Sequence, residues 1–362
     1  MKKILILTML LATVTVARAF SFSFDTPQGQ RLYYTVVTDN TVKLVAPGGD
    51  DGWDGYNDPQ GRLTIPASVT HDGTTYSVVA IDSRAFKDCD RITSVSIPAS
   101  VATIGALAFA NDSVMTSLYI EEGVTNIDRL AFHMCTRLDT IQLPSTLTRI
   151  AMQAFYGTAY YRNADNWSAS MVLTIGDWVV SVANTVAGEV LVPDHVKGIA
   201  NNAFYLCRYL DGVELPENLL YIGEAAFQGC SELDTVRMRA SVPPTLADDA
   251  FQGLTMVVKV PCGALQAYQA AQYWNAQTLV EETCPIAVET VDMPMAVTVA
   301  TTNGGIEVMH AEGQGLEVYD MTGRCQVSVQ VATDRQFLRL PAAGVYVLRL
   351  SDGRTARVVY SK

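Results

Sequence analysis

The chain has 362 residues, of which 49% are hydrophobic and 17% are charged, and its formal net charge is −12 at pH 7. This acidic balance argues against nucleic acid and anionic membrane surfaces as partners, because both attract clustered lysine and arginine. The length allows two or three domains.

The first residues have the pattern of a secretory signal peptide. A basic start at Met1-Lys2-Lys3 is followed by an apolar run from Ile4 to Val16 and then by Ala17-Arg18-Ala19. A short apolar core before an Ala-x-Ala site is typical of export signals. No later stretch approaches the roughly 18 consecutive apolar residues of a transmembrane helix. We therefore predict a signal peptide at residues 1–19 and an exported protein, secreted or associated with the outer-membrane surface, without direct membrane insertion.

Residues 20–80 are predicted to form a β-rich cap and the entry into the first coil. "RLYYTVV" and "TVKLVAP" have strand patterns, and Asp72-Gly73 in "SVTHDGTTYSVV" is the turn of a hairpin. An open stack of repeats needs such a cap to cover its first apolar end.

The loop "GGDDGWDGYNDPQG" in this cap is the best metal candidate of the chain, although a weak one. Asp50, Asp51 and Asp54 carry carboxylates suited to Ca²⁺. The spacing fails the EF-hand rule, because the twelfth position counted from Asp50 is Gly61 rather than Glu. A turn rich in Gly and Asp is the favoured interpretation, and we expect no metal and no cofactor.

The dipeptide Ala-Phe recurs at an almost constant interval over residues 81–261. The interval is 23 residues from Phe86 through Phe155, then 49 residues to Phe204, and then 23 and 24 residues. A period of this size is typical of stacked units that cannot bury their apolar faces alone. We predict a solenoid of about 23-residue coils, with parallel strands ~4.8 Å apart. The repeated residues are Phe86, Phe109, Phe132, Phe155, Phe204, Phe227 and Phe251.

Each coil contains a short strand with one outward residue between two buried residues. Val95 and Ile97 are such a buried pair, and Pro98 closes their strand because proline cannot donate to the next ladder bond. The outward positions are predicted to stack into one row of mixed chemistry, which is the candidate binding face. Tyr119 and Arg237 are its favoured anchors, since both residue types are enriched at binding hot spots. The row contains Ser96, Tyr119, Gln142, Leu191, Glu214 and Arg237.

The 49-residue gap after Phe155 corresponds to two coils plus three extra residues. We predict a degenerate coil there, with a strand that runs through "MVLTIGDWVVSV", residues 171–182. The preceding loop, from Ala159 to Ser170, is expected to bulge from the stack.

Beyond the last coil the pattern changes. An amphipathic helix that closes the solenoid is predicted at residues 262–284, followed by a linker at residues 285–303. Residues 304–362 have short strand patterns separated by Gly or Asp turns, which predict a small antiparallel β-sandwich. The residues on the apolar face of the predicted helix are Ala264, Leu265, Tyr268, Ala271 and Trp274.

The cysteines fall into two groups. Four of them follow a repeated Phe by three residues and are interpreted as small buried hydrophobes with free thiols; a bridge or a metal is the alternative. Cys262 and Cys284 lie outside this row and are a disulfide candidate in an exported protein. Cys325 is left over. The four in the row are Cys89, Cys135, Cys207 and Cys230.

The repeat "(I/L)-P-x-x-(V/L)-x-x-I-x-x-x-A-F-x-x-C" resembles the BspA-like leucine-rich repeats of surface proteins from anaerobic Bacteroidetes and treponemes. The resemblance covers about residues 62 to 262, and "VPCGALQAYQAAQYW" is similar to the last coil and helix of that family. It implies a leucine-rich-repeat solenoid and adhesion to extracellular matrix proteins or to other bacteria. The family has no shared catalytic residues.

The C-terminal segment resembles the type A sorting domain of the type IX secretion system. "LEVYDMTGR", "LPAAGVYVLRL" and "ARVVYSK" carry the likeness, whereas the frequent Pro-Asn-Pro opening is replaced by "TTNGGIEV". The resemblance implies delivery across the outer membrane, often with cleavage of the domain. A terminal β-module used as a spacer is the alternative.

Catalytic patterns are weak throughout the chain. The four histidines share no repeat position, and neither a Gly-x-Ser-x-Gly elbow nor a phosphate loop is present. His133 beside Cys135 is interpreted as a turn residue rather than half of a nucleophilic pair. We expect a non-enzymatic protein that binds an extracellular protein or glycan, with its ligand and oligomeric state left open. The alternatives are a spacer without a specific ligand and an enzyme with its site in the bulged loop or the Asp-rich loop.

Overall fold

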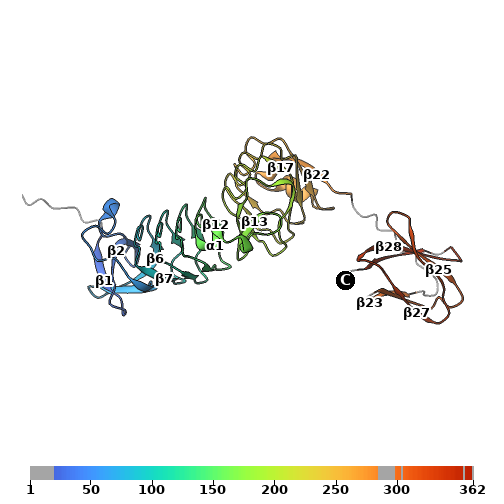
Figure 1. Ribbon diagram of the computed structural model, residues 1–362, viewed down its shortest axis with the longest axis horizontal. Helices are drawn as coiled ribbons and strands as arrows, with labels where there is room; N and C mark the ends of the chain where they lie inside the picture. Colours follow the sequence, from blue (N-terminus) through green and yellow to red (C-terminus); the bar gives the residue numbers. More distant parts are fainter. Residues whose placement is uncertain (1–19, 284–297, 303–304, 354, 361–362) are drawn as a thin grey trace, which may run out of the picture. The chain divides into compact units, whose positions relative to one another are not determined.

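A computed structural model of the protein describes residues 20–283, 298–302, 305–353 and 355–360 (Figure 1). The chain divides into two compact units after Thr283, and each unit has its own apolar core. The predicted signal peptide at residues 1–19 lies outside the described residues. Among the helices that are described, none is long and apolar enough to cross a membrane.

A β-sheet cap begins the first unit, as predicted. Three strands form an antiparallel meander, and two more form the hairpin around Asp72 and Gly73, whose φ angles are +47° and +78°. The third and sixth strands run parallel, so the cap continues directly into the coils. The cap contains β1 (Phe22–Asp25), β2 (Arg31–Thr38), β3 (Thr41–Val45), the 3-10 helix η1 (Gly49–Asp51), β5 (Ser68–His71) and β6 (Thr74–Ile81).

The coils that follow contribute one strand to each of two parallel sheets. In the first sheet Val95 lies opposite Leu118, and Leu118 lies opposite Ile141, so the predicted register is confirmed. The first sheet contains β4 (Gly61–Thr64), β7 (Ile92–Ile97), β9 (Ser117–Ile120) and β11 (Thr140–Gln142). The second extends from β6 through β8 (Thr103–Ile104), β10 (Asn126–Ile127) and β12 (Arg149–Ile150).

A second stack of coils repeats this arrangement with two further sheets. Val190, Val213 and Val236 are in register, again with parallel strands. One sheet contains β15 (Ala187–Leu191), β17 (Tyr209–Leu215), β19 (Thr235–Met238), β21 (Val257–Val260) and β22 (Thr278–Glu281). The other contains β13 (Val172–Ile175), β14 (Trp178–Val182), β16 (Gly198–Ile199), β18 (Tyr221–Ile222) and β20 (Thr245–Leu246).

The phenylalanine rings of neighbouring coils stack face to face inside the solenoid. In the first column successive ring centroids lie 5.0, 5.3 and 5.3 Å apart, and in the second column 4.5 and 5.1 Å apart. The preceding Ala fits where the turns crowd, and the amide of Phe109 donates to the carbonyl of Ala131 at 2.8 Å. A ring is therefore buried on both faces only when both neighbouring coils are present. The first column joins Phe86, Phe109, Phe132 and Phe155, and the second joins Phe204, Phe227 and Phe251.

Replacing Phe132 by Ala removes a fully buried ring that is stacked on both faces. We expect the free energy of unfolding to fall by about 3–5 kcal/mol, because the lost ring leaves a cavity. Chemical denaturation followed by circular dichroism measures the change. Val242→Ala is the control, since Val242 is 75% exposed, and its effect should stay within about 0.5 kcal/mol. Equal losses in the two variants would contradict the stacking account.

One buried acid interrupts the cysteine row. Asp112 occupies the repeat position of Cys89 and Cys135, which are buried free thiols as predicted. Its side chain is fully buried, and neither carboxylate oxygen accepts a hydrogen bond of ordinary geometry from the described residues. Burial disfavours the ionised form and raises the pKa of Asp112 well above its usual value, although the nearby backbone of Cys89 acts in the opposite direction. The solenoid therefore carries a destabilising carboxyl in its core.

Asp112→Asn should stabilise the protein at neutral pH. At low pH the carboxyl is protonated in both states, so its ionisation does not affect stability. As the pH rises above about 4, the unfolded state loses its proton first, and stability falls until the folded carboxyl ionises as well. Thermal unfolding should show that the gain in Tm from Asp112→Asn at pH 7 shrinks toward pH 4. The exposed Asp39→Asn is the control, and a gain for Asp112→Asn that is equal at both pH values would refute this explanation.

The two stacks are separated by a β-hairpin. β13 and β14 pair antiparallel, with Gly176 in the left-handed region at φ +54° in the turn between them. The prediction of one strand through residues 171–182 was therefore wrong, because the segment folds back on itself at Gly176. β14 then pairs in parallel with β16 and begins the second stack. The preceding loop contains α1 (Ala159–Arg162) and the 3-10 helix η2 (Ala164–Asn166).

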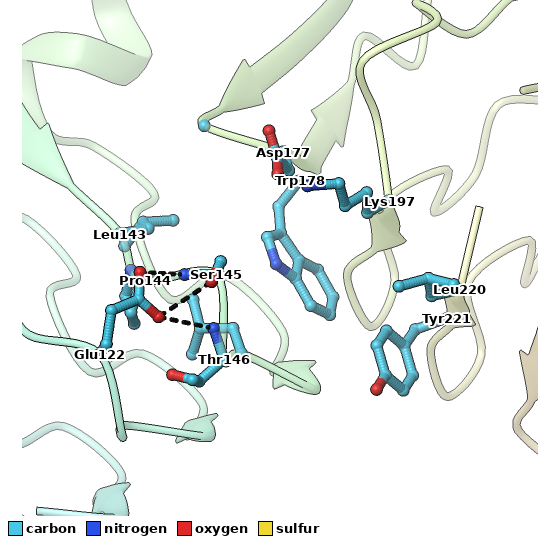
Figure 2. A pocket seen from close by; sticks show the side chains of 12 residues that line it. Glu122, Leu143, Pro144, Ser145, Thr146, Asp177, Trp178, Lys197, Leu220 and Tyr221 are labelled. Carbon is cyan, nitrogen blue, oxygen red and sulfur yellow. Dashed lines mark hydrogen bonds and ion pairs between the residues drawn. The ribbon is translucent and has the colours of Figure 1, made fainter. Parts of the chain in front are cut away.

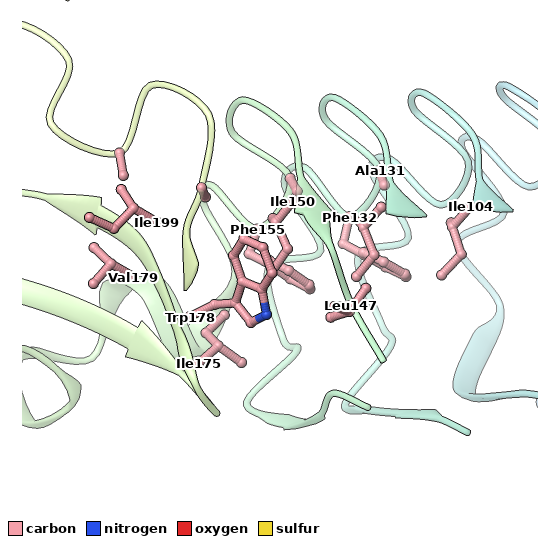
Figure 3. Packing of buried hydrophobic residues seen from close by; sticks show 14 of the residues in the cluster. Ile104, Ala131, Phe132, Leu147, Ile150, Phe155, Ile175, Trp178, Val179 and Ile199 are labelled. Atoms are coloured by element: carbon pink, nitrogen blue, oxygen red, sulfur yellow. The ribbon is translucent and has the colours of Figure 1, made fainter. Parts of the chain in front are cut away.

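The apolar core continues through this interruption. Phe155 ends the first column, and Ile175, Trp178 and Val179 of the hairpin belong to the same buried cluster (Figure 3). Trp178 is only 4% exposed and stacks on Tyr221 with ring centroids 6.1 Å apart. The hairpin thus covers the end of one stack and begins the next.

The far end of the solenoid is closed by a shorter helix than predicted. α2 (Leu265–Ala270) ends before Ala271, whose backbone is extended, and a 3-10 turn, η3 (Trp274–Ala276), precedes β22. The helix predicted over residues 262–284 is therefore corrected to one short helix, a 3-10 turn and a final strand. The cause is that the buried ring nitrogen of Trp274 donates to the carbonyl of Pro244 at 2.7 Å, which fixes the chain on the last coil. The five residues of the predicted apolar face all pack on the core.

The second unit consists of two antiparallel sheets around one apolar core. The linker predicted at residues 285–303 is too long, because β23 (Thr298–Thr302) already pairs with the next strand; residues 284–297 lie outside the described residues. The core includes Ile306, Val318, Leu338 and Leu348 from both sheets. One sheet contains β23, β24 (Gly305–Met309) and β27 (Arg335–Arg339), and the other contains β25 (Gly315–Asp320), β26 (Cys325–Gln330), β28 (Gly344–Leu350) and β29 (Thr355–Tyr360).

Candidate binding surfaces

The predicted row of six outward residues forms two separate rows. Ser96, Tyr119 and Gln142 are in register on β7, β9 and β11, and Leu191, Glu214 and Arg237 are in register on β15, β17 and β19. The expectation of one continuous row is corrected, because β11 and β15 belong to different sheets. Thr64 extends the first row, and Lys259 and Val280 extend the second. Each of these three residues is separated from its neighbour in the row by an interval other than 23 residues, so the repeat pattern did not reveal them.

The first row carries neutral hydrogen-bonding side chains. Tyr119 is 44% exposed, and Gln142 is exposed beside it. The parallel neighbouring row contains Ser94, Ser117 and Thr140, which add hydroxyl groups. Hydroxyl and amide groups both donate and accept hydrogen bonds, so this face can pair with backbone or glycan groups without a matching charge.

The second row is dominated by ion pairs. The guanidinium of Arg237 lies 3.0 Å from the carboxylate of Glu282 and 3.5 Å from that of Glu214. Arg239 contacts the same Glu214 at 3.5 Å and also pairs with Asp194. Arg237 is therefore already engaged within the protein, and a partner would have to displace these carboxylates. This makes Arg237 a weaker anchor than the sequence alone indicated.

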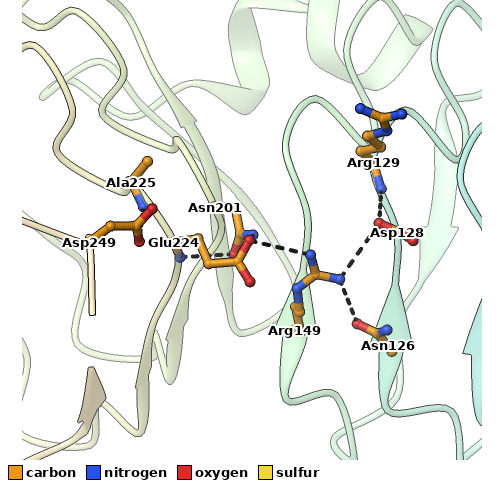
Figure 4. A network of polar contacts seen from close by, with 8 residues as sticks. All are labelled: Asn126, Asp128, Arg129, Arg149, Asn201, Glu224, Ala225 and Asp249. Atoms are coloured by element: carbon orange, nitrogen blue, oxygen red, sulfur yellow. Dashed lines mark hydrogen bonds and ion pairs between the residues drawn. The ribbon is translucent and has the colours of Figure 1, made fainter. Parts of the chain in front are cut away.

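A polar network joins the two stacks (Figure 4). The guanidinium of Arg149 lies 3.6 Å from Asp128 on one side and 3.4 Å from Glu224 on the other. Glu224 accepts a hydrogen bond of 2.7 Å from the buried amide of Asn201, whose backbone nitrogen donates to the carbonyl of Ile150 at 2.9 Å. The network holds the last coil of the first stack against the first coils of the second.

A cleft of about 320 Å³ opens at this interruption (Figure 2). One wall comes from the first stack around Glu122 and Ser145, and the other contains Trp178, Lys197 and Tyr221. Glu122 accepts hydrogen bonds from the backbone and the hydroxyl of Ser145 at 2.9 and 3.0 Å, which hold the pKa of its carboxyl below the usual range. Lys197 pairs with Asp177 at 2.6 Å. The charged groups of this cleft are thus satisfied within the protein.

The hairpin depends on a close contact between Trp178 and Gly198. A Cβ atom at Gly198 would lie 2.6 Å from the indole ring, well inside van der Waals contact. Gly198 is the residue of β16 that faces Trp178 of β14 in register. The sequence did not point to either residue. The contact depends on the absence of a side chain at Gly198, and this coil departs too far from the repeat for a glycine there to stand out.

Gly198→Ala should destabilise the protein by about 1–3 kcal/mol, since the indole must move within a packed core. Denaturation followed by the combined fluorescence of the four tryptophans measures the loss. Gly212→Ala is the matched control, because a Cβ there meets its nearest atom at an ordinary 3.5 Å. If both variants unfold at the same denaturant concentration, the contact has no structural importance.

The metal and catalytic candidates do not form a site among the described residues. Asp50 is highly exposed and pairs with Arg84 at 3.2 Å, and the side chain of Asp51 lies outside the described residues. In the part of the chain that the structure describes, no group of three His, Cys, Asp or Glu side chains is placed to hold a metal ion, with Asp54 included. Trp53, in the same loop, is buried and stacks on Phe86 at 5.9 Å, so the loop closes the first column.

The neighbouring His133 and Cys135 have separate environments. His133 stacks on Tyr156 at 5.7 Å, and partial burial lowers its pKa. Cys135 is buried and donates to the carbonyl of Phe109 at 3.0 Å, and burial raises the pKa of its thiol. A thiol held in its neutral form is a poor nucleophile.

Cys262 is disulfide-bonded. Its predicted partner, Cys284, lies outside the described residues, so this pairing stays a prediction. Cys325 is an exposed free thiol.

Residues 72–179 and 181–291, together more than half of the chain, match in six copies the family model described as BspA type leucine rich repeat region. Among solved structures, a leucine-rich repeat protein from Bacteroides capillosus is 28% identical and is matched over 36% of this chain and 91% of its own, with a TM-score of 0.32. A leucine rich repeat protein from T. pallidum is 22% identical over 62% of this chain and 83% of its own, with a TM-score of 0.34. A leucine rich cell surface protein from Faecalibacterium prausnitzii is 19% identical over 73% of this chain and 96% of its own, with a TM-score of 0.25. No curated protein matches the chain.

Proposed function

The chain belongs to the BspA-type leucine-rich repeat family, and from this premise we propose that it is an exported, non-catalytic protein that binds an extracellular protein or glycan. The solenoid offers a preformed surface. Binding of a partner therefore does not require the binding face to become ordered, which lowers the entropic cost of association. Many modest contacts along the strands, with a few anchors, would then set the affinity.

The row Thr64, Ser96, Tyr119 and Gln142 on the first stack carries this proposal. These side chains lie in register across β4, β7, β9 and β11. The ring of Tyr119 is 44% exposed in the middle of the row. Ion pairs already occupy the corresponding position on the second stack, Arg237. The first row is thus the better candidate for contact with a partner.

Export through the type IX secretion system is the second part of the proposal. It is supported by the signal-peptide pattern of residues 1–19 and by the resemblance of the C-terminal segment to a type A sorting domain. "LEVYD" and "GVYVLRL" fall on β25 and β28, which are neighbours in one sheet. In this proposal the second unit directs delivery, and the solenoid does the binding.

Tyr119→Ala should weaken binding to a partner by at least tenfold, which corresponds to about 1.4 kcal/mol. The reason is that the variant removes the largest exposed side chain of the first row without touching the core. The full-length protein is titrated against immobilised extracellular matrix proteins and mucins, and the dissociation constants of wild type and variant are compared for each protein that binds.

Tyr209→Ala is the matched control, because Tyr209 is 57% exposed on β17 of the second stack. Arg237→Ala should have a small effect, since its charge is already paired. Unchanged binding by Tyr119→Ala together with a loss in Arg237→Ala would move the binding face to the second stack. If no protein or mucin of the panel binds saturably, the chain has no specific partner among them and the spacer interpretation gains.

A further inference from the structure

A second cleft, of about 470 Å³, opens at the interruption between the two stacks. Its walls come from the last turn of the first stack, from β14, and from the first turns of the second stack. None of the residues that line it is charged, although 17% of the residues in the chain are. The cleft is therefore a neutral site on an acidic protein.

Exposed tyrosine side chains line this cleft, and one of them is packed against other aromatic rings. Tyr156 and Tyr205 line it and are 42% and 47% exposed. The ring of Tyr156 is supported by His133 at 5.7 Å and by Tyr161 at 4.9 Å. Tyr161 in turn packs edge-on against Trp167 at 5.3 Å, and the ring nitrogen of Trp167 donates to the carbonyl of Tyr161 at 2.8 Å. The ring of Tyr156 is thus ordered before a ligand arrives, which lowers the entropic cost of binding.

Amide side chains also line the cleft. Gln153, Asn202 and Gln228 line the cleft, and the only hydrogen bond that joins two of them among the described residues is a long one of 3.5 Å, from Asn202 to Gln228. No described residue pairs with the hydroxyl of Tyr156 or of Tyr205. An amide or a hydroxyl both donates and accepts, and so does each hydroxyl group of a sugar. An anionic or cationic ligand would find no opposite charge on these walls.

We propose that this cleft binds a neutral oligosaccharide. Sugar rings present apolar C–H faces to the tyrosine rings and hydroxyl groups to the amides, which is the combination that the walls offer. The inference rests on the proposal that the chain is a binding protein, and it adds a site distinct from the first row. The loop from Ala159 to Ser170 supports the ring of Tyr156 through Tyr161 and Trp167, which gives the interruption of the solenoid a binding role.

The test is a titration of the full-length protein with uncharged oligosaccharides of glucose, mannose, galactose and N-acetylglucosamine, followed by calorimetry. At least one of them should bind saturably, and its affinity should stay constant within about twofold when salt rises from about 0.05 to 0.5 M, because no ion pair contributes. Tyr205→Ala and Gln228→Ala should each weaken binding by at least tenfold. Tyr205→Phe, which keeps the ring, should retain more affinity than Tyr205→Ala, and a circular dichroism spectrum and Tm of Tyr205→Ala equal to those of wild type exclude misfolding as the cause.

Tyr209→Ala and Tyr119→Ala are the controls, because both remove exposed tyrosines outside the cleft. Oligosaccharide binding that survives in Tyr119→Ala supports the cleft even if the first row binds no protein. Failure of all the neutral oligosaccharides to bind overturns the inference and leaves the first row untouched. Unchanged affinity in Tyr205→Ala also overturns it, and so does a panel protein or peptide whose binding is lost in Tyr205→Ala while no oligosaccharide binds.

Discussion

Each coil of this protein buries its phenylalanine against the phenylalanine of the next coil, or at the end of a column against a capping tryptophan or the hairpin. The rings are spaced at 4.5–5.3 Å within each column, close to the distance between neighbouring parallel strands. Stacking of the rings and pairing of the strands therefore require the same rise from one coil to the next. Every coil must then place its phenylalanine at the same point, so the residue recurs at a nearly constant interval in the sequence. A further consequence is that every outward position of a strand is repeated directly beside itself, so the surface is organised in rows.

The regular stacking of coils stops at the interruption after Phe155. Extra residues form a hairpin and a loop with the short helix α1, and the rows of the two stacks lose their continuity. The apolar cluster of Phe155 with Ile175 and Trp178 and the network around Arg149 and Glu224 hold the stacks together in place of one continuous column. The interruption also leaves two clefts in the surface. These clefts are concave sites of a kind that a regular solenoid lacks. In the first cleft the charged side chains already have partners within the protein, whereas the second cleft has neutral walls.

The repeat made the coils, their register and the apolar face of the end cap predictable, because each depends on a short pattern of buried side chains. The split of the outward row was not predictable, since a 49-residue gap counts as two coils whether or not β11 pairs with β15. The burial of Trp53 was hidden because its loop is rich in Gly and Asp, whereas that of Asp112 could have been read from the repeat, since Asp112 occupies the position of the buried cysteines. The capping helix was predicted too long, as helical periodicity alone cannot locate the point where Trp274 docks and turns the chain. Tyr156 and Tyr205 of the neutral cleft each follow a repeated phenylalanine directly, so the repeat itself places them at one shared position, whereas Tyr161 comes from the short helix α1 outside the repeat.

The central claim is that binding takes place on the first row and at the neutral cleft, and side-chain oxidation by hydroxyl radicals tests it directly. The full-length protein is oxidised with and without a bound matrix protein or neutral oligosaccharide, and each tyrosine is quantified by mass spectrometry. The account predicts that a protein partner protects Tyr119, that an oligosaccharide protects Tyr205, and that Tyr209 reacts equally in all samples. Saturated complexes in which neither Tyr119 nor Tyr205 is protected would contradict it.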